Sequence, residues 1–329
     1  MSVVAGPGFV SLLGLDPATY DRHAVHGGGG TYGETNCYAD VLVELLHARG
    51  DEPLAAMGHL VRMDFEGDQF TFFKPPPGDV EALFGVDVHE MQPYRPLPNQ
   101  IAEQIEAGRT LIVELDAWFL PDTAATSYRA AHVKTSCAFE AIDLEGERLR
   151  YFHGPGLFEL AGEDYRGVFR LDGTGSADVL PPYTELVRFD AGPRLEGEAL
   201  RAAARGLLRH HLARRPTEDP ILRFGAQLAA TLPDLLAGDA QLYHDYAFAT
   251  VRMLGSGAEV LAAHASWLLG AGARAGAEPA VAALGRVVDG AKLLSFKLAR
   301  RRAFEPEAAI ADLASAWDEA LDRLDAATT

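Results

Sequence analysis

Cysteine is nearly absent from the sequence, which contains only Cys37 and Cys137 among its 329 residues. Two cysteines cannot build the disulfide framework of a small secreted protein, and no metal-binding spacing is present. We therefore expect both thiols to be reduced. We also expect no metal and no cofactor on the chain itself.

Basic residues and long apolar runs are also scarce. The 29 Lys and Arg residues are outnumbered by 47 Asp and Glu residues, which gives a formal net charge of -18. Nucleic-acid binding needs clustered Lys and Arg, so we expect no nucleic-acid partner. No apolar run approaches the ~20 residues that span a bilayer. The start, Met1–Val10, lacks the basic residues and cleavage pattern of a signal peptide, so we expect a cytoplasmic protein with no membrane partner.

One stretch departs from the acidic average. Between residues 285 and 303, Asp289 is the only acidic residue. The basic residues of this stretch are Arg286, Lys292, Lys297, Arg300, Arg301 and Arg302. A solvated helix face is the more common interpretation of such a run, and a docking face for an acidic partner is the alternative.

Composition changes between Asp190 and Pro193. Before this point, short apolar runs alternate with glycine, proline and acidic turns, which indicates α+β structure. After it, alanine, leucine and arginine dominate. Helices are expected there at 199–213, 220–236, 240–253, 258–269, 279–303 and 306–326. The sequence therefore predicts an α+β domain at 1–190 and a helical domain or cap at 191–329.

The first part is expected to contain an antiparallel meander that follows an N-terminal helix at 37–48. Further helices are expected at 52–60, 78–84 and 99–107, and strands at 70–73, 110–119, 132–142, 149–152 and 167–171. The turn residues at 143–146 predict a hairpin between two of these strands.

Cys37 stands where the helical pattern begins, because Val41, Leu42, Leu45 and Leu46 follow it at helical spacing. A cysteine on the first turn of a helix lies at the positive end of the peptide dipole, which favours thiolate over thiol. The thiolate is the nucleophilic form. Cys37 is therefore the candidate nucleophile, and a small buried residue on an ordinary helix is the alternative.

A thiol nucleophile needs a neighbouring base and a group that orients the base. His132 opens an expected strand, and its order after the cysteine helix makes it the candidate base. Asp116 and His153 are the candidates for the orienting residue. Cys137, in the middle of a strand, is expected to be a core residue.

An oxyanion hole should form where negative charge develops on the attacked carbonyl. The backbone N–H of Cys37 is the expected first donor. The second can come from Thr35, Asn36 or Gln69, among which the sequence does not choose. The polar and then aromatic stretch at 66–74 fits a substrate cleft or an ordinary loop equally well.

Four passages resemble a bacterial family that is catalogued only as a domain of unknown function and is found near genes for amino acid:carrier-protein ligases. They lie at 35–40, 64–74, 113–123 and 128–135. A more distant resemblance is to the N-terminal domain of butirosin biosynthesis protein H, a papain-like aminoacyl transferase. The shared features are a cysteine at a helix start, a strand aspartate before an aromatic-Leu-Pro sequence, and a histidine that opens the next strand.

The second resemblance implies a papain-like antiparallel sheet with helices, with Cys37 as nucleophile, His132 as base and Asp116 as the strand aspartate. His153-Gly154 replaces the Asp-Pro of the relative, which leaves the third catalytic position open. The implied activity is transfer of an acyl or aminoacyl group from a carrier-protein thioester to an amine. The implied partner is an acidic carrier protein that bears the phosphopantetheine. A thiol hydrolase (a peptidase, amidase or thioesterase) and a non-catalytic carrier-binding protein are the alternatives.

Overall fold

The chain forms two compact units in a computed structural model that describes residues 8–173, 179–270 and 274–328. The first unit comprises residues up to 26, 37–53 and 77–195. The second comprises 27–36, 54–76 and the chain from 196 onward. Two segments of the N-terminal part therefore belong to the second unit, a feature that the composition does not reveal. Of the start Met1–Val10, residues 1–7 lie outside the described residues.

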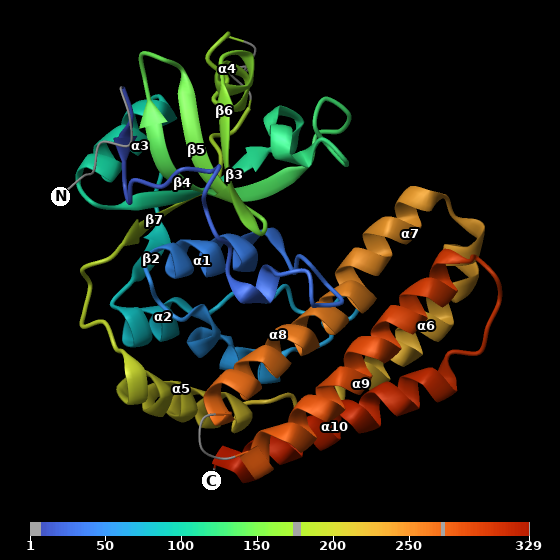
Figure 1. Cartoon of the computed structure of the whole chain (residues 1–329). Coiled ribbons are helices and arrows are strands. Elements are labelled where there is room, and N and C mark those ends of the chain that lie inside the picture. Colours follow the sequence, from blue (N-terminus) through green and yellow to red (C-terminus); the bar gives the residue numbers. More distant parts are fainter. Residues whose placement is uncertain (1–7, 174–178, 271–273, 329) are drawn as a thin grey trace. The chain divides into compact units, whose positions relative to one another are not determined.

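An antiparallel sheet forms the centre of the first unit (Figure 1). Within the described residues it has seven strands in the order β2-β7-β3-β4-β5-β6, and β1 also pairs with β4. The strands are β1 (Val10–Ser11), β2 (Asp87–Glu90), β3 (Thr110–Asp116), β4 (Lys134–Asp143), β5 (Arg148–His153), β6 (Gly156–Ala161) and β7 (Thr184–Arg188).

Four α-helices accompany the described sheet: α1 (Cys37–Ala48), α2 (Pro77–Phe84), α3 (Leu97–Glu106) and α4 (Glu163–Val168). Helix α1 packs on β4 and β5 through a nearly continuous buried surface. Helix α3 packs on β3 and β4. The mixed α+β class with an antiparallel sheet is therefore confirmed.

Three expectations for the first unit are wrong in detail. The segment 167–171 is not a strand, because α4 begins at Glu163 and buries Tyr165 and Val168 three residues apart. Strand β3 ends at Asp116 because the side chain of this residue caps a short 3-10 helix at Ala117–Phe119. Strand β4 begins at Lys134, so His132 precedes the strand and does not open it.

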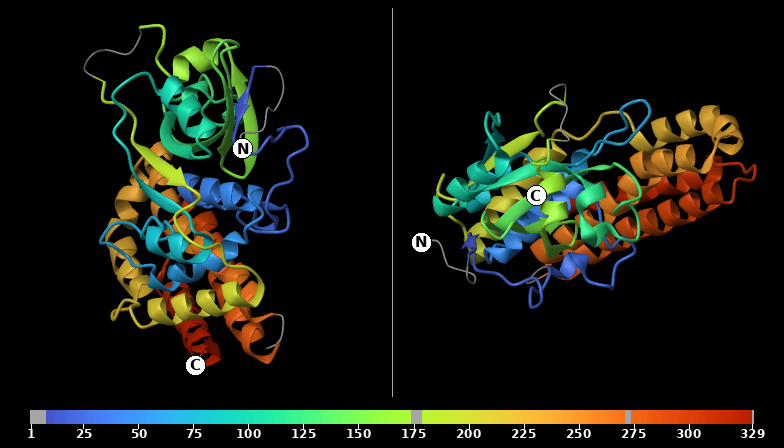
Figure 2. Two further views of the ribbon diagram at one scale, coloured as in Figure 1. Left: turned by 90° about the vertical axis from the view of Figure 1, so that its left-hand side faces the viewer. Right: turned by 90° about the horizontal axis from the view of Figure 1, so that it is seen from above.

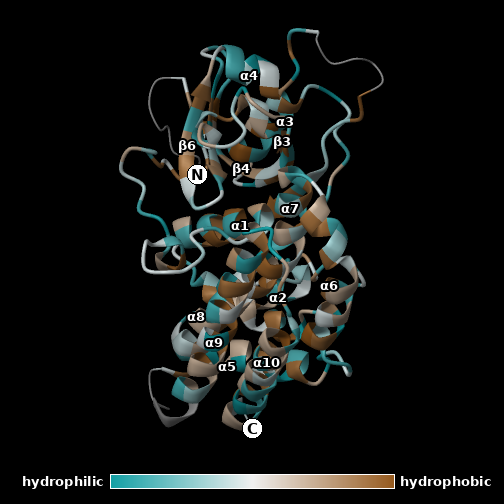
Figure 3. Cartoon of the chain, turned by 90° about the vertical axis from the view of Figure 1, so that its right-hand side faces the viewer, coloured by the Kyte–Doolittle hydropathy of each residue, from teal (hydrophilic) through white to brown (hydrophobic). Residues whose placement is uncertain are grey.

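Six α-helices are described in the second unit, and all fall in the region where the sequence predicts helices. They are α5 (Gly197–Leu212), α6 (Pro220–Ala237), α7 (Ala240–Ala247), α8 (Met253–Leu269), α9 (Arg274–Ala299) and α10 (Glu307–Thr328). A π-helical turn at Phe248–Arg252 separates α7 from α8. Helix α9 packs against both α8 and α10, as Figure 2 shows in orange and red. Apolar and polar residues alternate along these helices in Figure 3, as expected of amphipathic helices.

The segment 54–76 belongs to the second unit and packs on its helices. Phe65, Phe70 and Phe224 of α6 form an aromatic cluster with ring centroids 5.3 to 5.7 Å apart. The expected helix at 52–60 is a 3-10 helix, Pro53–Arg62. The expected strand at 70–73 is reduced to one bridge between Phe65 and Phe70. None of the helices in the described parts of the chain combines the length and the apolar character needed to cross a membrane.

Candidate active site around Cys37

Cys37 is the first residue of α1, and its side chain is partly exposed. Its Sγ lies 3.6 Å from the hydroxyl Oγ of Ser136 on β4, within hydrogen-bonding range for sulfur. The first-turn N–H groups of an α-helix have no acceptor within the helix, and they add to the positive end of its dipole. The thiol of Cys37 is therefore accessible and lies at the N-terminus of α1.

A row of polar side chains extends along the sheet from Ser136. Ser136 lies opposite Glu114 of β3, and Lys134 lies opposite Asp116. Alternate residues of a strand share one face, so these four side chains belong to the same face of the sheet as the Cys37 contact. The Nζ of Lys134 donates to Oε1 of Glu114 across 2.6 Å. We call these four residues the polar row. Only one of them, Asp116, is a candidate site residue from the sequence.

His132 stands at the far end of the polar row. Its Nδ1 donates to Oδ2 of Asp116 across 2.7 Å, and its ring stacks on Trp118 with centroids 4.6 Å apart. Because the N–H at Nδ1 donates this hydrogen bond, the neutral imidazole has its lone pair on Nε2. The side chain of His132 is 68% exposed. Of the two candidate orienting residues, Asp116 is therefore the one that contacts His132.

The structure does not bring the imidazole of His132 to the sulfur of Cys37. Ser136, which contacts the sulfur, lies four residues beyond His132, and four residues of extended chain span about 13 Å. The physical reason is that β4 begins only at Lys134, so Ser136 occupies the strand position beside the first turn of α1. The expected direct contact between base and nucleophile is thus absent from this geometry.

His153 belongs to a separate cluster. Its Nδ1 lies 2.5 Å from Oδ2 of Asp122, and its Nε2 lies 2.8 Å from Oγ1 of Thr135. Tyr151 donates to the other oxygen of Asp122. Thr135 is adjacent to Ser136 in β4 and therefore faces the opposite side of the sheet. His153 consequently does not orient His132.

Cys137 shares the face of Thr135 and is fully buried, as expected of a core residue. Burial raises the pKa of its thiol well above the ordinary value. Cys137 is therefore held as a neutral thiol, which is a poor nucleophile.

The three candidate oxyanion donors all lie in the second unit. The Nδ2 of Asn36 donates to the backbone carbonyl of Phe73, 2.9 Å away. Thr35 is buried, and Gln69 is exposed in the turn before Phe70. The Asn36 amide therefore fixes the chain immediately before the cysteine.

A cavity of about 720 Å³ lies in the first unit next to the polar row. Its polar lining includes Glu114, Asp116, His132, Lys134 and Arg170, and its apolar lining includes Phe119, Val133 and Phe169. Such a mixture of charged groups and apolar walls is typical of small-molecule sites. No group of three or more His, Cys, Asp or Glu side chains able to hold a metal ion is found among the described residues.

The basic residues of the second unit have different roles. Arg286 forms an ion pair of 2.5 Å with Glu319 of α10. Arg301 has a left-handed backbone (φ 51°) and donates to the carbonyl of Gly238, which follows α6. Arg300 stacks on Phe296 at 4.3 Å, and Lys297 lies 5.7 Å from the ring of Phe304. Lys292 and Arg302 are exposed.

Comparison with protein families gives two matches. A family model described as the DUF1839 N-terminal domain matches residues 21–189. A second, described as the DUF1839 C-terminal domain, matches residues 197–326. No curated protein matches the chain.

Proposed function

Since the chain belongs to the DUF1839 family, whose description states no activity, we propose its function from the site itself: a cysteine-dependent acyl or aminoacyl transferase. The donor is a carrier-protein thioester and the acceptor is an amine. The observation that carries this proposal is the partly exposed thiol of Cys37 on the first turn of α1. A thiolate at that position is a suitable acceptor for an acyl group.

The arrangement of α1 and the sheet supports a papain-like plan. In that plan a helix carries the nucleophile at its N-terminus and packs on an antiparallel sheet that carries the base. Here Cys37 begins α1, α1 packs on β4 and β5, and the His132–Asp116 pair lies at the start of β4 and the end of β3. This order of elements supports the proposed papain-like plan, whereas the missing contact between nucleophile and base does not.

The proposed reaction has two steps. In the first, the Cys37 thiolate attacks the thioester carbonyl, so that a carbon–sulfur bond to Cys37 forms and the bond to the carrier thiol breaks. The departing carrier thiolate takes a proton. In the second step, the acceptor amine attacks the acyl-cysteine, the carbon–sulfur bond to Cys37 breaks, and the amine proton passes to a base. We propose His132 as the group that finally donates and accepts these protons through solvent, since its exposed imidazole does not contact the sulfur of Cys37.

The experiment that tests the proposal is intact-mass spectrometry of the chain after mixing with aminoacylated carrier protein. A mass gain equal to the aminoacyl group supports an acyl-enzyme. Its transfer to an added amine supports a transferase. Release of free acid when no amine is present supports the thiol hydrolase instead.

Replacing Asp116 with Asn is expected to slow transfer about a hundredfold. The Asn carbonyl oxygen can still accept from the Trp118 N–H, which Asp116 now caps at 3.0 Å. The Asn amide, however, donates where the carboxylate accepts, and therefore disfavours the proton on Nδ1 of His132. Single-turnover transfer from the preformed acyl-enzyme measures the change.

His89→Ala is the matched control for this prediction, because His89 also pairs with an aspartate, Asp87, at 2.9 Å but does not line the cavity. Its transfer rate should equal that of the unmodified protein. An Asp116→Asn variant with an unchanged rate would remove His132 from the proposed mechanism.

A docking surface for an acidic carrier is proposed on α9, where Leu293 and Phe296 are each 53% exposed next to Lys292 and Arg300. Reversing the charge of Lys292 and Arg300 to Glu should weaken carrier binding about tenfold or more, because opposite charges steer and hold such complexes. Arg301 is left unchanged because it donates a hydrogen bond to the carbonyl of Gly238 at the end of α6.

Binding of the carrier is measured by calorimetry at low salt. Arg205→Glu with Arg209→Glu on α5 is the charge-matched control, and an equal effect in both pairs would refute a specific surface.

A non-catalytic carrier-binding protein is the second candidate. It is favoured by the separation of His132 from Cys37, since a base that does not contact the thiol cannot take its proton directly. This candidate predicts that loaded carrier binds without any gain in mass on the chain.

A further inference from the structure

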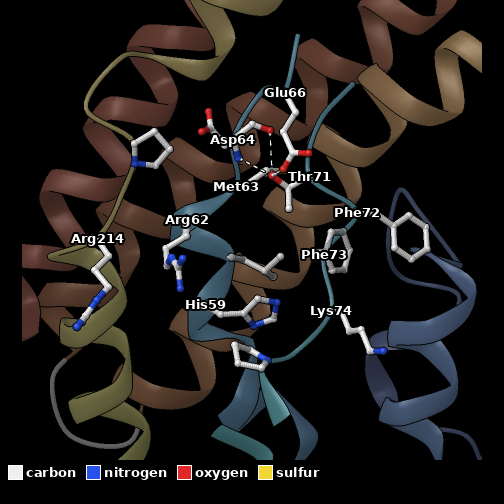
Figure 4. Close-up of a pocket in the computed structure, with 13 residues that line it drawn as sticks. His59, Arg62, Met63, Asp64, Glu66, Thr71, Phe72, Phe73, Lys74 and Arg214 are labelled. Atoms are coloured by element: carbon white, nitrogen blue, oxygen red, sulfur yellow. Dashed lines mark hydrogen bonds between the residues drawn. The ribbon is translucent and has the colours of Figure 1, made fainter. Parts of the chain in front are cut away.

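The second unit contains a cavity of about 380 Å³ (Figure 4). Arg62 and Arg214 lie on the opposite side of this cavity from Phe72 and Lys74, and Glu66 stands apart from both groups. Polar groups that are so dispersed do not converge on one small ligand. The cavity of about 720 Å³ in the first unit differs, because a cationic group and an apolar wall are adjacent there. We call this larger cavity the apolar-walled cavity.

Exposed apolar side chains gather at the apolar-walled cavity. Val133, Val179, Leu180 and Tyr183 line it, and their exposed fractions are 45%, 47%, 81% and 42%. One exposed valine or leucine needs no explanation, whereas several around a single cavity indicate a surface that a ligand covers. The apolar wall continues inward to the buried side chain of Leu115. The cavity therefore favours a ligand with an apolar body.

Most charged groups of this cavity are already paired within the protein. The Nζ of Lys134 donates to Glu114 across 2.6 Å, and Nδ1 of His132 donates to Asp116 across 2.7 Å. Arg170 is exposed and forms no ion pair among the described residues. A guanidinium stays protonated under all ordinary conditions. Arg170 therefore gives the cavity a positive group that no described carboxylate neutralises.

Arg170 occupies a backbone position that ordinarily belongs to glycine. It follows the end of α4 with a left-handed backbone, φ 57°. Its N–H donates to the carbonyl of Gly167 across 3.0 Å, and the N–H of Leu171 donates to the carbonyl of Arg166 across 2.8 Å. This pair of bonds closes the end of a helix, and glycine is favoured at the left-handed residue because a side chain there is strained. A role for the arginine side chain would explain why this strain is retained.

The guanidinium group of Arg170 is adjacent to the apolar wall. Its Nη1 donates to the backbone carbonyl of Leu180 across 2.9 Å, and Val179 precedes Leu180 in the same segment. A guanidinium has five N–H donors in a planar fork that matches a carboxylate, so donors remain for a ligand. A carboxylate bound to Arg170 therefore brings the apolar chain of the same ligand to Val179 and Leu180.

We propose that the apolar-walled cavity binds a monocarboxylic acid with an extended apolar body, of the medium-chain fatty acid type. The carboxylate accepts from Arg170, and the chain covers the exposed side chains of Val179 and Leu180. A neutral apolar ligand would leave the guanidinium group without an anion, and a cationic one would be repelled by it. This inference does not rest on the proposed acyl transfer, because Cys37 does not line the cavity and binding is measured without a carrier protein.

Calorimetric titration of the full chain with octanoate, 1-octanol and octylammonium near neutral pH tests the proposal, since the three probes share one apolar body and differ in the head group. Octanoate should bind, and the other two should bind at least about tenfold more weakly. Hexanoate keeps the carboxylate but lacks two methylene groups. It should bind about tenfold more weakly than octanoate, because less apolar surface is covered.

Replacing Arg170 separates the role of the head group from that of the wall. Arg170→Gln should reduce octanoate binding to the level of 1-octanol, whereas Arg170→Lys should keep part of the preference for the carboxylate. Arg22→Gln is the matched control, because Arg22 is an exposed arginine of the same unit that does not line the cavity. Since Arg170 is exposed, all three variants should melt near the temperature of the unmodified protein.

Three results would overturn the assignment. The first is the absence of octanoate binding up to about 10 mM, which corresponds to an interaction too weak for a specific site. The second is equal binding of octanoate by Arg170→Gln and the unmodified protein, since apolar surface alone does not select a carboxylate. The third is equal binding of hexanoate and octanoate, which would remove the apolar wall from the site. None of these results bears on the acyl adduct of Cys37, which is measured separately with loaded carrier.

Discussion

Cys37→Ala is expected to abolish the acyl adduct and to reduce acyl transfer about a thousandfold or more. The methyl group of alanine cannot attack a thioester. The other polar side chains in the first turn of α1, Tyr38 and Asp40, are buried and hydrogen-bonded to Glu185 and His26. The measurement is the mass of the chain after incubation with loaded carrier, followed by the rate of amine acylation.

The control for this result is Cys137→Ala, which removes the other thiol. Cys137 is buried on the opposite face of the sheet, so this variant should keep the adduct while losing a little stability. Cys37→Ala must also melt near the temperature of the unmodified protein, because a partly exposed side chain contributes little to the core. An adduct that persists in Cys37→Ala would exclude the acyl-cysteine mechanism, whereas an adduct that is lost only in Cys137→Ala would reassign the nucleophile.

His26→Ala is expected to lower the free energy of unfolding by about 3–5 kcal/mol. The imidazole is buried between two carboxylates of α1: its Nδ1 contacts Glu44, and its Nε2 lies 3.2 Å from Oδ1 of Asp40. Both carboxylate side chains are almost completely buried. Removing the imidazole leaves two negative groups in the interior without their shared cation, and a buried charge without a partner is strongly destabilising.

Urea unfolding at pH 6 measures this loss. His89→Ala is the matched control, because His89 pairs with Asp87 in a largely exposed position where an ion pair contributes about 0–1 kcal/mol. An equal effect of the two substitutions would show that the cluster around His26 is held by packing rather than by charge.

The same cluster determines how stability depends on pH. Burial by itself lowers the pKa of His26, but hydrogen bonds and charges from Asp40 and Glu44 outweigh burial and raise the pKa to about 9. Because the folded pKa lies above the ordinary value of 6.5, this contribution is fully present below pH 6.5 and is lost as the pH rises through about 9. Burial raises the pKa of Glu44, but hydrogen bonds from His26 and Tyr20 lower it below 4.5, so its contribution is lost only in acid.

The difference in unfolding free energy between the unmodified protein and His26→Ala should therefore be larger at pH 6 than at pH 9.5. Unfolding curves at the two pH values give this comparison. A difference that stays constant across that range would mean that His26 does not gain its proton on folding.

The helices could be predicted from the sequence because their signals are local. Apolar residues at helical spacing after Cys37 predicted α1, and Pro220 after Asp219 marked the start of α6, where Asp219 accepts from the N–H groups of Ile221 and Leu222. Pro279 misled the prediction, since it lies inside α9 rather than at its start. The membership in a domain-of-unknown-function family also followed from short passages of sequence.

The contacts between the candidate catalytic side chains could not be predicted from local sequence, because they depend on the register of the sheet. Strand β4 begins at Lys134, two residues later than expected, and the residue beside Cys37 is Ser136, four residues beyond His132. The alternation of side chains along a strand sends His153 to the opposite face, where Asp122 and Thr135 contact it. No local pattern indicates that Glu114 and Lys134 complete the polar row.

By itself the sequence determined the class of the fold, the helices of the C-terminal part and the position of Cys37 on the first turn of a helix, because each depends on residues close together in the chain. Only the tertiary structure decided which side chains meet: the His132–Asp116 pair, the Ser136 contact of the sulfur and the cluster around His26. The physical reason is that strand pairing and helix docking join residues distant in sequence, and a change of one residue in register moves a side chain to the other face.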